Sequence, residues 1–197
     1  YTFHLSSYGV YQKQNDFNSM MMTNVIGTFN LLESLEKYSE SSKIINVGSF
    51  FEYGRKFKSI KKSDLLEPNN LYGISKAAQS LTANYFSLKS KLKINTLRIF
   101  GAFGRYESEN RLIPDILLSI LKHKKLFISS PKSKRDFIHI DDVVSCLLKT
   151  SKTKLNNEII NVGNGVEYSV EEIIEICRRC FNEKIPIPMY QLLNIFC

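Results

Sequence analysis

Tyr72 and Lys76 stand four residues apart in the segment LYGISK, and together they could carry acid–base chemistry. Residues i and i+4 share one face of a helix, so the two side chains would be neighbours if the segment is helical. A lysine ammonium beside a phenol favours the phenolate and lowers the tyrosine pKa, so the tyrosine could exchange protons near neutral pH. The same spacing also occurs on ordinary helix surfaces, and the pair alone leaves both interpretations open.

Ser49 is a second candidate, because it closes the apolar run KIINVGS. A short run rich in β-branched residues is typical of a buried strand. The hydroxyl would then emerge at the carboxyl end of the strand, where open α/β sheets form their ligand crevices. The alternative is a serine that only shapes a turn. Gly48, directly before it, and Gly54, which ends GSFFEYG, would let the chain turn and let a ligand approach the backbone.

The elements that would position these residues alternate along the first hundred positions. Apolar runs predict strands at Thr2–Ser6, Lys43–Ser49 and Lys93–Phe100. Apolar positions spaced by three or four residues predict helices at about 16–38 and from Leu71 onward. Strands separated by helices of this length form βαβ crossovers and a parallel sheet.

The second half of the chain is more mixed. The predicted helices and strands are, in order, a helix at Ile113–Lys122, a strand at Leu126–Ser129, a helix at Asp141–Thr150, a strand at Glu158–Val162 and a helix at Ser169–Cys180. Ser169 and Glu172 have capping-box spacing, which predicts where the last helix begins. We interpret Asp141 and Asp142 as the first turn of a helix, where carboxylates complement the dipole, and expect no metal site.

Composition narrows the function classes. The chain has 197 residues, a formal charge of +8 and 43% hydrophobic residues, which suffices for a packed core. Its basic residues are scattered and lack a nucleic-acid signature, so no nucleic acid partner is expected. It contains no run of ~18 apolar residues and no signal-peptide pattern, so no membrane insertion is expected. Cys177 and Cys180 lie in a helical pattern, and unpaired cysteines fit the cytoplasm.

Seven short motifs together resemble a known family. In chain order they are HLSS, N-V-x-G-T from Asn24, S-x-x-x-Y-G from Ser49, Y-x-x-x-K from Tyr72, LRIFGAFG, RDFIHIDDV and NVGNG. Their order and spacing resemble the extended short-chain dehydrogenase/reductase family, and within it the NAD-dependent epimerase/dehydratase branch, which acts on nucleotide sugars. The resemblance covers about residues 1–180.

The resemblance implies roles for individual residues. Tyr72 would be the acid/base at a sugar hydroxyl or ketone, Lys76 would hold the nicotinamide ribose, and Ser49 would hydrogen-bond the reacting oxygen. NAD or NADP would exchange the hydride. The implied cofactor neighbours are Leu5, Ser6, Ser7, Asn24, Tyr72, Lys76 and Phe100, and the implied substrate contacts are Phe50, Phe51 and Arg135.

Arg135 would contact the diphosphate of a nucleotide-diphosphate sugar, because a guanidinium forks onto phosphate oxygens. The alternative is an arginine that only pairs with Asp136 or Asp142.

The implied fold class is α/β: a partial, doubly wound Rossmann sheet without its first βαβ units, with part of a small α/β substrate-binding region. Residues 1–104 would form the C-terminal half of the NAD-binding domain. Residues 105–197 would form a mixed segment, part of the nucleotide-sugar-binding region, with elements returning to the Rossmann domain at about 135–165. Relatives commonly dimerise through the helices corresponding to those of Asn24 and Tyr72, so a homodimer is expected.

Three departures from the family pattern matter. Phe50 and Phe51 stand where 4,6-dehydratases carry an acidic pair, so dehydration is not expected. Gly101 replaces the asparagine of L-R-x-F-N, which places one substrate contact in question. The glycine-rich turn that cradles the cofactor pyrophosphate does not occur in these 197 residues. We therefore expect these residues alone to bind NAD(H) poorly, to leave the Thr2–Ser6 strand as an open edge, and to aggregate.

The leading prediction is an NAD(P)-dependent nucleotide-sugar epimerase or 4-ketoreductase as the full-length protein, serving surface-polysaccharide biosynthesis. An epimerase recycles its NAD and a reductase consumes NAD(P)H, and the motifs do not separate the two or identify the sugar. The alternatives are a truncated gene product and a non-catalytic NAD-binding or scaffold relative on the same fold.

Overall fold

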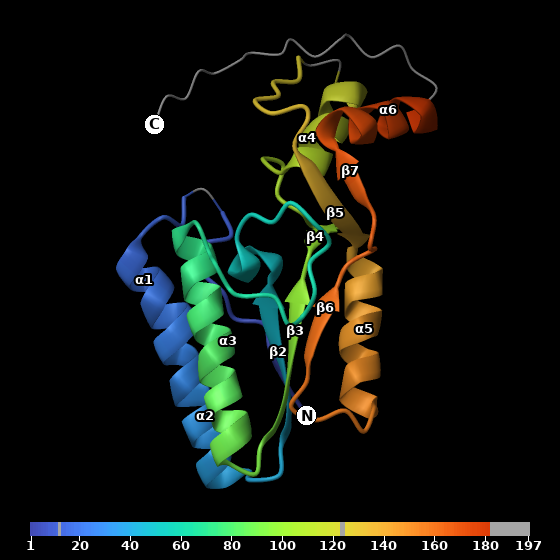
Figure 1. Ribbon diagram of the computed structural model, residues 1–197. Helices are drawn as coiled ribbons and strands as arrows, with labels where there is room; N and C mark the ends of the chain where they lie inside the picture. The colour runs from blue at the N-terminus through green and yellow to red at the C-terminus, as the bar shows by residue number, and fades with distance from the viewer. Residues whose placement is uncertain (12, 123–124, 182–197) are drawn as a thin grey trace. The chain divides into compact units, whose positions relative to one another are not determined.

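A computed structural model describes residues 1–11, 13–122 and 125–181 (Figure 1). The chain divides into two compact units. The first contains Tyr1–Phe100 and Asp142–Val162, and the second contains Gly101–Asp141 and the residues from Gly163 onward. Each unit has its own cluster of buried hydrophobic side chains. Among the residues described, no helix is long and apolar enough to cross a bilayer.

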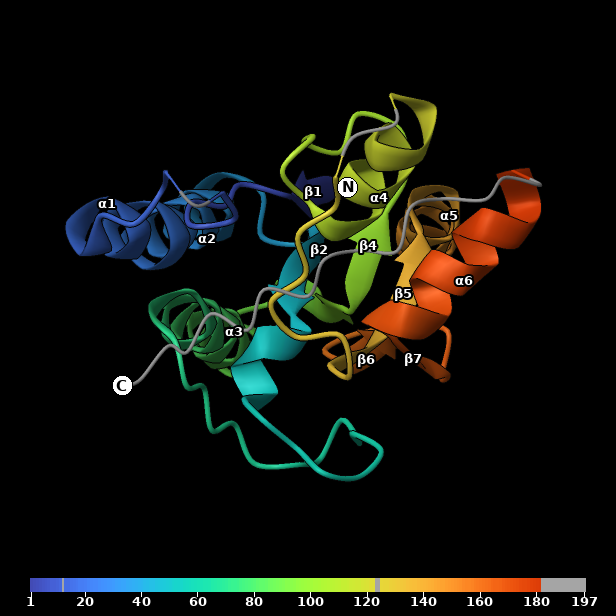
Figure 2. The same cartoon turned by 90° about the horizontal axis from the view of Figure 1, so that it is seen from above.

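The first unit is a four-stranded parallel sheet covered by helices on both faces. Its strands are β1 (Thr2–His4), β2 (Lys43–Ser49), β3 (Lys93–Ile99) and β6 (Ile159–Val162), and they lie side by side in the order β1-β2-β3-β6. The helices α1 (Phe17–Met21), α2 (Gly27–Tyr38) and α3 (Leu71–Lys89) lie on one side, and α5 (Ile140–Lys152) lies on the other (Figures 1 and 2). This arrangement confirms the predicted α/β fold with a parallel sheet.

The central strands β2 and β3 are buried along most of their length, which explains their continuous apolar runs. β2 has the predicted bounds, and β1 lies at the edge of the sheet, as predicted. Side-chain caps set two helix starts: Asp16 accepts from the Ser19 N–H, and Asn70 accepts from the Gly73 N–H.

The helix predicted at about 16–38 is interrupted by one π-helical turn, η1 (Met22–Ile26), between α1 and α2. This turn contains Asn24, whose side chain is fully buried. Single π-helical turns inside α-helices occur frequently at functional sites.

The second unit contains a three-stranded sheet and two helices. The strands β4 (Gly101–Phe103), β5 (Lys134–His139) and β7 (Glu167–Ser169) lie in the order β4-β5-β7, with a parallel pair followed by an antiparallel pair. The helices are α4 (Leu112–Leu121) and α6 (Val170–Phe181). The predicted capping box at the start of α6 is confirmed, because Ser169 and Glu172 each accept a hydrogen bond from the other's backbone N–H.

The strand predicted at Leu126–Ser129 is wrong. The structure has only a single bridging residue there, Phe127. Leu126 and Ile128 are buried in the hydrophobic cluster of the second unit, so the alternating pattern reflects packing and not strand pairing. The sequence did not predict β4, β5 or β7.

Candidate active site

The predicted position of Ser49 is confirmed: it is the last residue of the buried strand β2. A single 3-10 turn, η2 (Phe50–Tyr53), follows it directly. The Ser49 hydroxyl oxygen accepts from the Phe51 N–H at 3.3 Å, and the Glu52 carboxylate accepts from the Ser49 N–H at 2.7 Å. These two bonds form a capping box that fixes the serine. Because the hydroxyl oxygen is an acceptor here, its hydrogen can still be donated.

Tyr72 lies in the first turn of α3, next to this Ser49 turn. Its ring meets the ring of Phe51 edge to face, with 5.8 Å between the centroids. A Cβ atom added at Gly73 would lie 2.5 Å from the Phe51 carbonyl oxygen. Glycine at position 73 therefore allows α3 to approach the turn closely enough to bring Tyr72 beside it.

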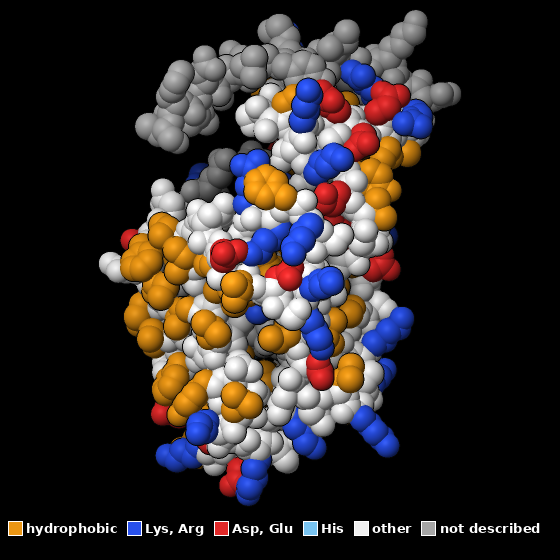
Figure 3. All heavy atoms as spheres, viewed as in Figure 1, with side chains coloured by type: hydrophobic (Ala, Val, Ile, Leu, Met, Phe, Trp, Pro, Cys, Tyr) orange, Lys and Arg blue, Asp and Glu red, His pale blue; other side chains and the backbone are white. Residues whose placement is uncertain are grey.

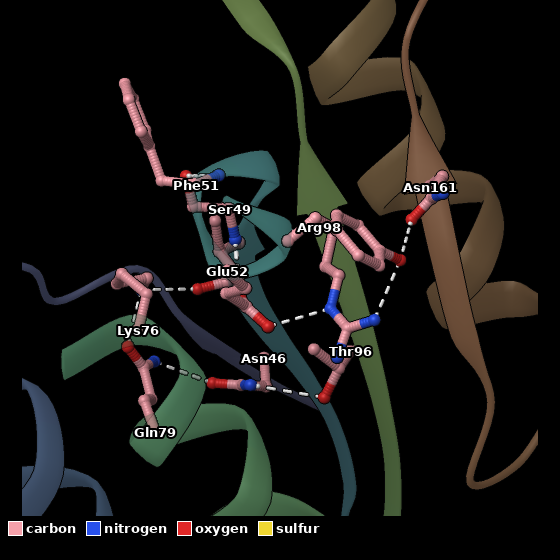
Figure 4. A network of polar contacts seen from close by, with 11 residues as sticks. Asn46, Ser49, Phe51, Glu52, Lys76, Gln79, Thr96, Arg98 and Asn161 are labelled. Carbon is pink, nitrogen blue, oxygen red and sulfur yellow. Dashed lines mark hydrogen bonds and ion pairs between the residues drawn. The ribbon is translucent and has the colours of Figure 1, made fainter. Parts of the chain in front are cut away.

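Lys76 is almost fully buried, with 1% of its surface exposed. Its ammonium donates to the Val47 carbonyl at 2.7 Å and to the Gln79 side-chain carbonyl at 2.5 Å (Figure 4). Burial lowers the pKa of Lys76 to about 8, and the negative charge of Glu52 opposes that shift. Lys76 is therefore not an ordinary helix-surface residue.

Glu52 forms a buried ion pair behind the Ser49 turn. Its carboxylate accepts from the Arg98 Nε at 2.7 Å, and both side chains are at least 96% inaccessible to solvent. Arg98 also donates to the Tyr53 hydroxyl at 2.7 Å, and that hydroxyl donates to the Asn161 side-chain oxygen at 2.7 Å (Figure 4). This network joins the Ser49 turn to β3 and β6.

Gly48 leaves room for a neighbouring side chain: a Cβ atom at this position would lie 2.5 Å from the Glu52 carboxylate. The chain turns directly after it, as expected, and the approach of a ligand to this backbone stays a prediction. Sequence reasoning missed Glu52, although Ser49 and Glu52 have the same S-x-x-E spacing that identified the cap of α6.

Asn24 connects the segment after β1 to the helix of Tyr72. Its side-chain oxygen accepts from the Tyr8 N–H at 2.8 Å, while its amide donates to the Tyr8 carbonyl at 2.8 Å and to the Ser75 hydroxyl at 2.9 Å. The Ser75 hydroxyl donates in turn to the Tyr72 carbonyl at 2.8 Å. Because Asn24 is fully buried, we interpret it as a support for the site and not as a surface for the cofactor.

Leu5, Ser6 and Ser7 follow the carboxyl end of β1. Leu5 is 58% exposed and Ser6 is also exposed. The Ser7 hydroxyl oxygen is buried, and among the described residues it has no hydrogen-bond partner. A buried hydroxyl without a partner is uncommon and can be satisfied by a ligand or by water.

Aromatic side chains line the carboxyl ends of β2 and β3. The rings of Phe50 and Phe51 lie 4.3 Å apart, and Phe50 stacks on Phe100 at 5.5 Å. The structure therefore brings Ser49, Phe50, Phe51, Phe100, Tyr72 and Lys76 together within the first unit.

Arg135 belongs to β5 of the second unit. Arg135 as a whole residue is exposed to solvent. Partial burial of its guanidinium and repulsion from Arg111 both lower its pKa. The Asp136 carboxylate accepts from the backbone N–H groups of Asn164 and Gly165. In the described part of the chain, no ion pair joins Arg135 to Asp136 or Asp142.

Comparison with known proteins identifies the family. Residues 1–163 match the family model described as the NAD dependent epimerase/dehydratase family. The chain belongs to this family. The resemblance inferred from the seven motifs is thereby confirmed.

Family relatives include epimerases and a reductase. The chain is 26% identical over 181 residues to the UDP-glucose 4-epimerase of Mycoplasma genitalium, covering 80% of this chain and 53% of that protein. It is 27% identical over 139 residues to the dTDP-4-dehydro-6-deoxyglucose reductase of Escherichia coli, covering 68% of this chain and 44% of that protein. The chain thus spans about half the length of the curated relatives it matches.

Solved structures of the family share this fold. The UDP-glucuronic acid 4-epimerase from Bacillus cereus, in complex with UDP-glucuronic acid and NAD, superposes with a TM-score of 0.84 at 25% identity. The match covers 92% of this chain and 59% of that one.

Proposed function

We propose that the full-length protein is an NAD-dependent enzyme that acts on a nucleotide-diphosphate sugar, as a 4-epimerase or a 4-ketoreductase. The observation that carries this proposal is the buried lysine. Lys76 lies beneath the Ser49 turn, and Tyr72 packs against the same turn. A buried ammonium with a lowered pKa next to a proton-transfer group is typical of an active site. The named activities of the family relatives support the same assignment.

Three side chains would perform the acid–base step. Tyr72 would take the proton from the sugar hydroxyl and return it to the ketone, and the Lys76 ammonium would favour the phenolate form needed for the first step. The Ser49 hydroxyl would donate a hydrogen bond to the reacting oxygen. Bound NAD would supply the nicotinamide ring that accepts or returns the hydride.

The residues present fit a nicotinamide cofactor. The Ser7 hydroxyl, which has no hydrogen-bond partner within the described part of the chain, lies just after β1 and offers a hydrogen bond there. We propose that Leu5, Ser6, Ser7, Lys76 and Phe100 contact the cofactor. NAD is favoured because a solved family member holds it.

Dehydration is not part of the proposal. Phe50 and Phe51 supply apolar rings where elimination of water would need carboxylates. The one carboxylate in the Ser49 turn, Glu52, is already bound to Arg98 and to the Ser49 N–H.

Substitution Tyr72→Phe in the full-length protein tests the function. Turnover should fall by about 10²- to 10⁴-fold, the usual contribution of a positioned acid/base, while NAD binding measured by calorimetry should persist. Tyr106→Phe is the control, because Tyr106 is a fully exposed tyrosine outside the proposed dimer face, and it should keep full activity. Retained turnover in Tyr72→Phe would remove this residue from the mechanism.

The amount of NAD(P)H consumed per product separates a reductase from an epimerase, because an epimerase shows no net consumption.

Arg135 and Arg111 are proposed to bind the substrate diphosphate. Repulsion between the two guanidiniums, which lowers the pKa of Arg135, would be relieved by an anion, although the Arg111 Nε also pairs with the Glu107 carboxylate at 3.3 Å. Arg135→Met should raise the KM for the nucleotide sugar by about 10- to 100-fold and change kcat much less, because it removes ground-state binding. An unchanged KM would mean that Arg135 does not bind the substrate diphosphate.

We propose that the protein is a homodimer through the Asn24 helix (η1 and α2) and the Tyr72 helix (α3). Exposed apolar side chains gather over α1, α2 and α3 (Figure 3), and those on η1, α2 and α3 are Met22, Ile26, Phe29, Tyr38, Leu71, Ile74, Leu81, Tyr85 and Leu88. An apolar face of this extent is typical of a protein interface. Sedimentation should show a dimer that Ile26→Asp converts to a monomer, and a wild-type monomer would contradict the proposal.

The cytoplasmic location is proposed from the cysteines. Cys146, Cys177 and Cys180 are free, which fits a reducing compartment. A role in surface-polysaccharide synthesis stays a prediction, and neighbouring sugar-transferase genes would support it.

A further inference from the structure

A chain of buried polar side chains leads away from Lys76 into the sheet. The amide of Gln79, which accepts from the Lys76 ammonium, donates to the Asn46 side-chain oxygen at 2.8 Å. The Asn46 amide donates to the Thr96 hydroxyl at 3.2 Å (Figure 4). Gln79 is fully buried and Asn46 is 1% exposed. Asn46 and Thr96 are register partners on β2 and β3, so the chain is anchored in the centre of the sheet.

The direction of this chain is set by the lysine. An ammonium can only donate, so Gln79 must present its carbonyl to Lys76 and its NH2 group to Asn46. Asn46 must then present its oxygen to Gln79 and its NH2 group to Thr96. A reversed Gln79 amide would place donor against donor at Lys76 and oxygen against oxygen at Asn46, so each amide holds the next in one orientation.

The fold does not require an amide at position 79. Burying an amide costs free energy unless its groups are paired, and an apolar side chain of similar length would fill the same space. Lys76 does require an acceptor there. Among the described residues no hydrogen bond joins Lys76 to the Glu52 carboxylate, whose oxygens accept from Arg98 and from the Ser49 N–H. The hydrogen bonds of the ammonium go to the Val47 and Gln79 carbonyls. Gln79 therefore supplies the side-chain acceptor that Lys76 uses.

We propose that Gln79 is a positioning residue for Lys76: with the Val47 carbonyl, it takes two of the three ammonium N–H groups and leaves one for the reacting groups. Asn46 serves this arrangement by holding the Gln79 amide in the required orientation. The inference rests on the proposed function for what the third N–H does, but the contact itself can be tested without cofactor or substrate.

The test follows the titration of Lys76 by NMR in full-length protein labelled with [ε-13C]lysine, with the Lys76 signal assigned by its loss in Lys76→Arg. The wild-type signal should titrate near pH 8. Gln79→Met keeps the volume of the side chain but removes the acceptor of the ammonium, so the titration midpoint of Lys76 should fall by about half to one pH unit. Gln79→Glu places a carboxylate against the ammonium, so the titration should move up. Thr82→Ala is the control. It removes the hydrogen bond from the Thr82 hydroxyl to the Ala78 carbonyl, elsewhere on α3, and should leave the pKa of Lys76 unchanged.

Shifts of opposite sign in the two variants support the proposal, because a residue that only fills space would not produce them. Unchanged titration in both overturns it. If circular dichroism shows that Gln79→Met does not fold, the Gln79→Glu variant decides alone: an upward shift supports the proposal and no shift overturns it. The pH dependence of turnover should move in the same direction in each variant. Should Tyr72→Phe retain turnover while the titration shifts appear, the proposed function fails and the role of Gln79 on Lys76 stands.

Discussion

The burial of Lys76 should make the stability of the fold depend on pH in an identifiable way. Its pKa is about 8 in the folded protein, against 10.5 for an ordinary lysine. Between these values the unfolded chain binds more protons than the folded one, so the free energy of unfolding rises with pH. Below pH 8 the folded state carries the full penalty of a buried charge, and as pH rises towards 10.5 that penalty disappears.

The size of the effect follows from the two pKa values. The difference in bound protons between the unfolded and folded states can be integrated from pH 7 to pH 10. The result is that Lys76 adds on the order of 2 to 3 kcal/mol to the free energy of unfolding over this range. Other groups titrate in the same range, so the wild type alone would not isolate the lysine.

Lys76→Met provides the reference. The two proteins share every other titrating group, and the hydrogen bonds lost with the ammonium add a nearly constant offset. Urea unfolding at pH 7, 8, 9 and 10 should therefore show wild-type stability rising relative to Lys76→Met by roughly 2 to 3 kcal/mol. Parallel curves for the two proteins would mean that Lys76 keeps an ordinary pKa, and the argument from burial would be refuted.

Three further substitutions test the surroundings of the site and one helix cap. Gly73→Ala would press a methyl group against the Phe51 carbonyl, so turnover should fall at least about tenfold and the thermal midpoint should drop; unchanged kinetics would show that α3 can shift without consequence. Glu52→Gln leaves the buried Arg98 charge unpaired and should cost about 3–5 kcal/mol in urea unfolding, whereas a cost below about 1 kcal/mol would mean that water reaches this pair. Ser169→Ala removes the cap of α6 and should cost about 1 kcal/mol in urea unfolding without changing turnover.

The elements that carry long apolar patterns could be predicted from the sequence. β2, β3 and α3 bury a continuous run or a periodic face, and those patterns are visible without knowledge of their neighbours. The strands β4 and β7 have three residues each, and β5 begins with charged residues. The pairing of these strands depends on contacts between segments that are distant in the sequence, so a local sequence pattern cannot predict it.

The same distinction holds within the candidate site. Ser49, Tyr72 and Lys76 could be singled out from their spacing and from the order of motifs. Gln79 and Arg98 could not, because a polar side chain inside an apolar segment has no periodic signal and its partners come from other strands. The π-helical turn at Asn24 could not be predicted either, because its residues are equally compatible with an α-helix.

Several contacts that hold the proposed catalytic residues and their support Asn24 are made with main-chain atoms. Gly73 approaches the carbonyl of Phe51, Lys76 bonds the carbonyl of Val47, and Asn24 bonds both backbone groups of Tyr8. Main-chain atoms stay the same whatever side chain a position carries. An exchange of the Phe51 side chain would therefore leave the Gly73 and Lys76 contacts in place and would change only the ring contact between position 51 and Tyr72.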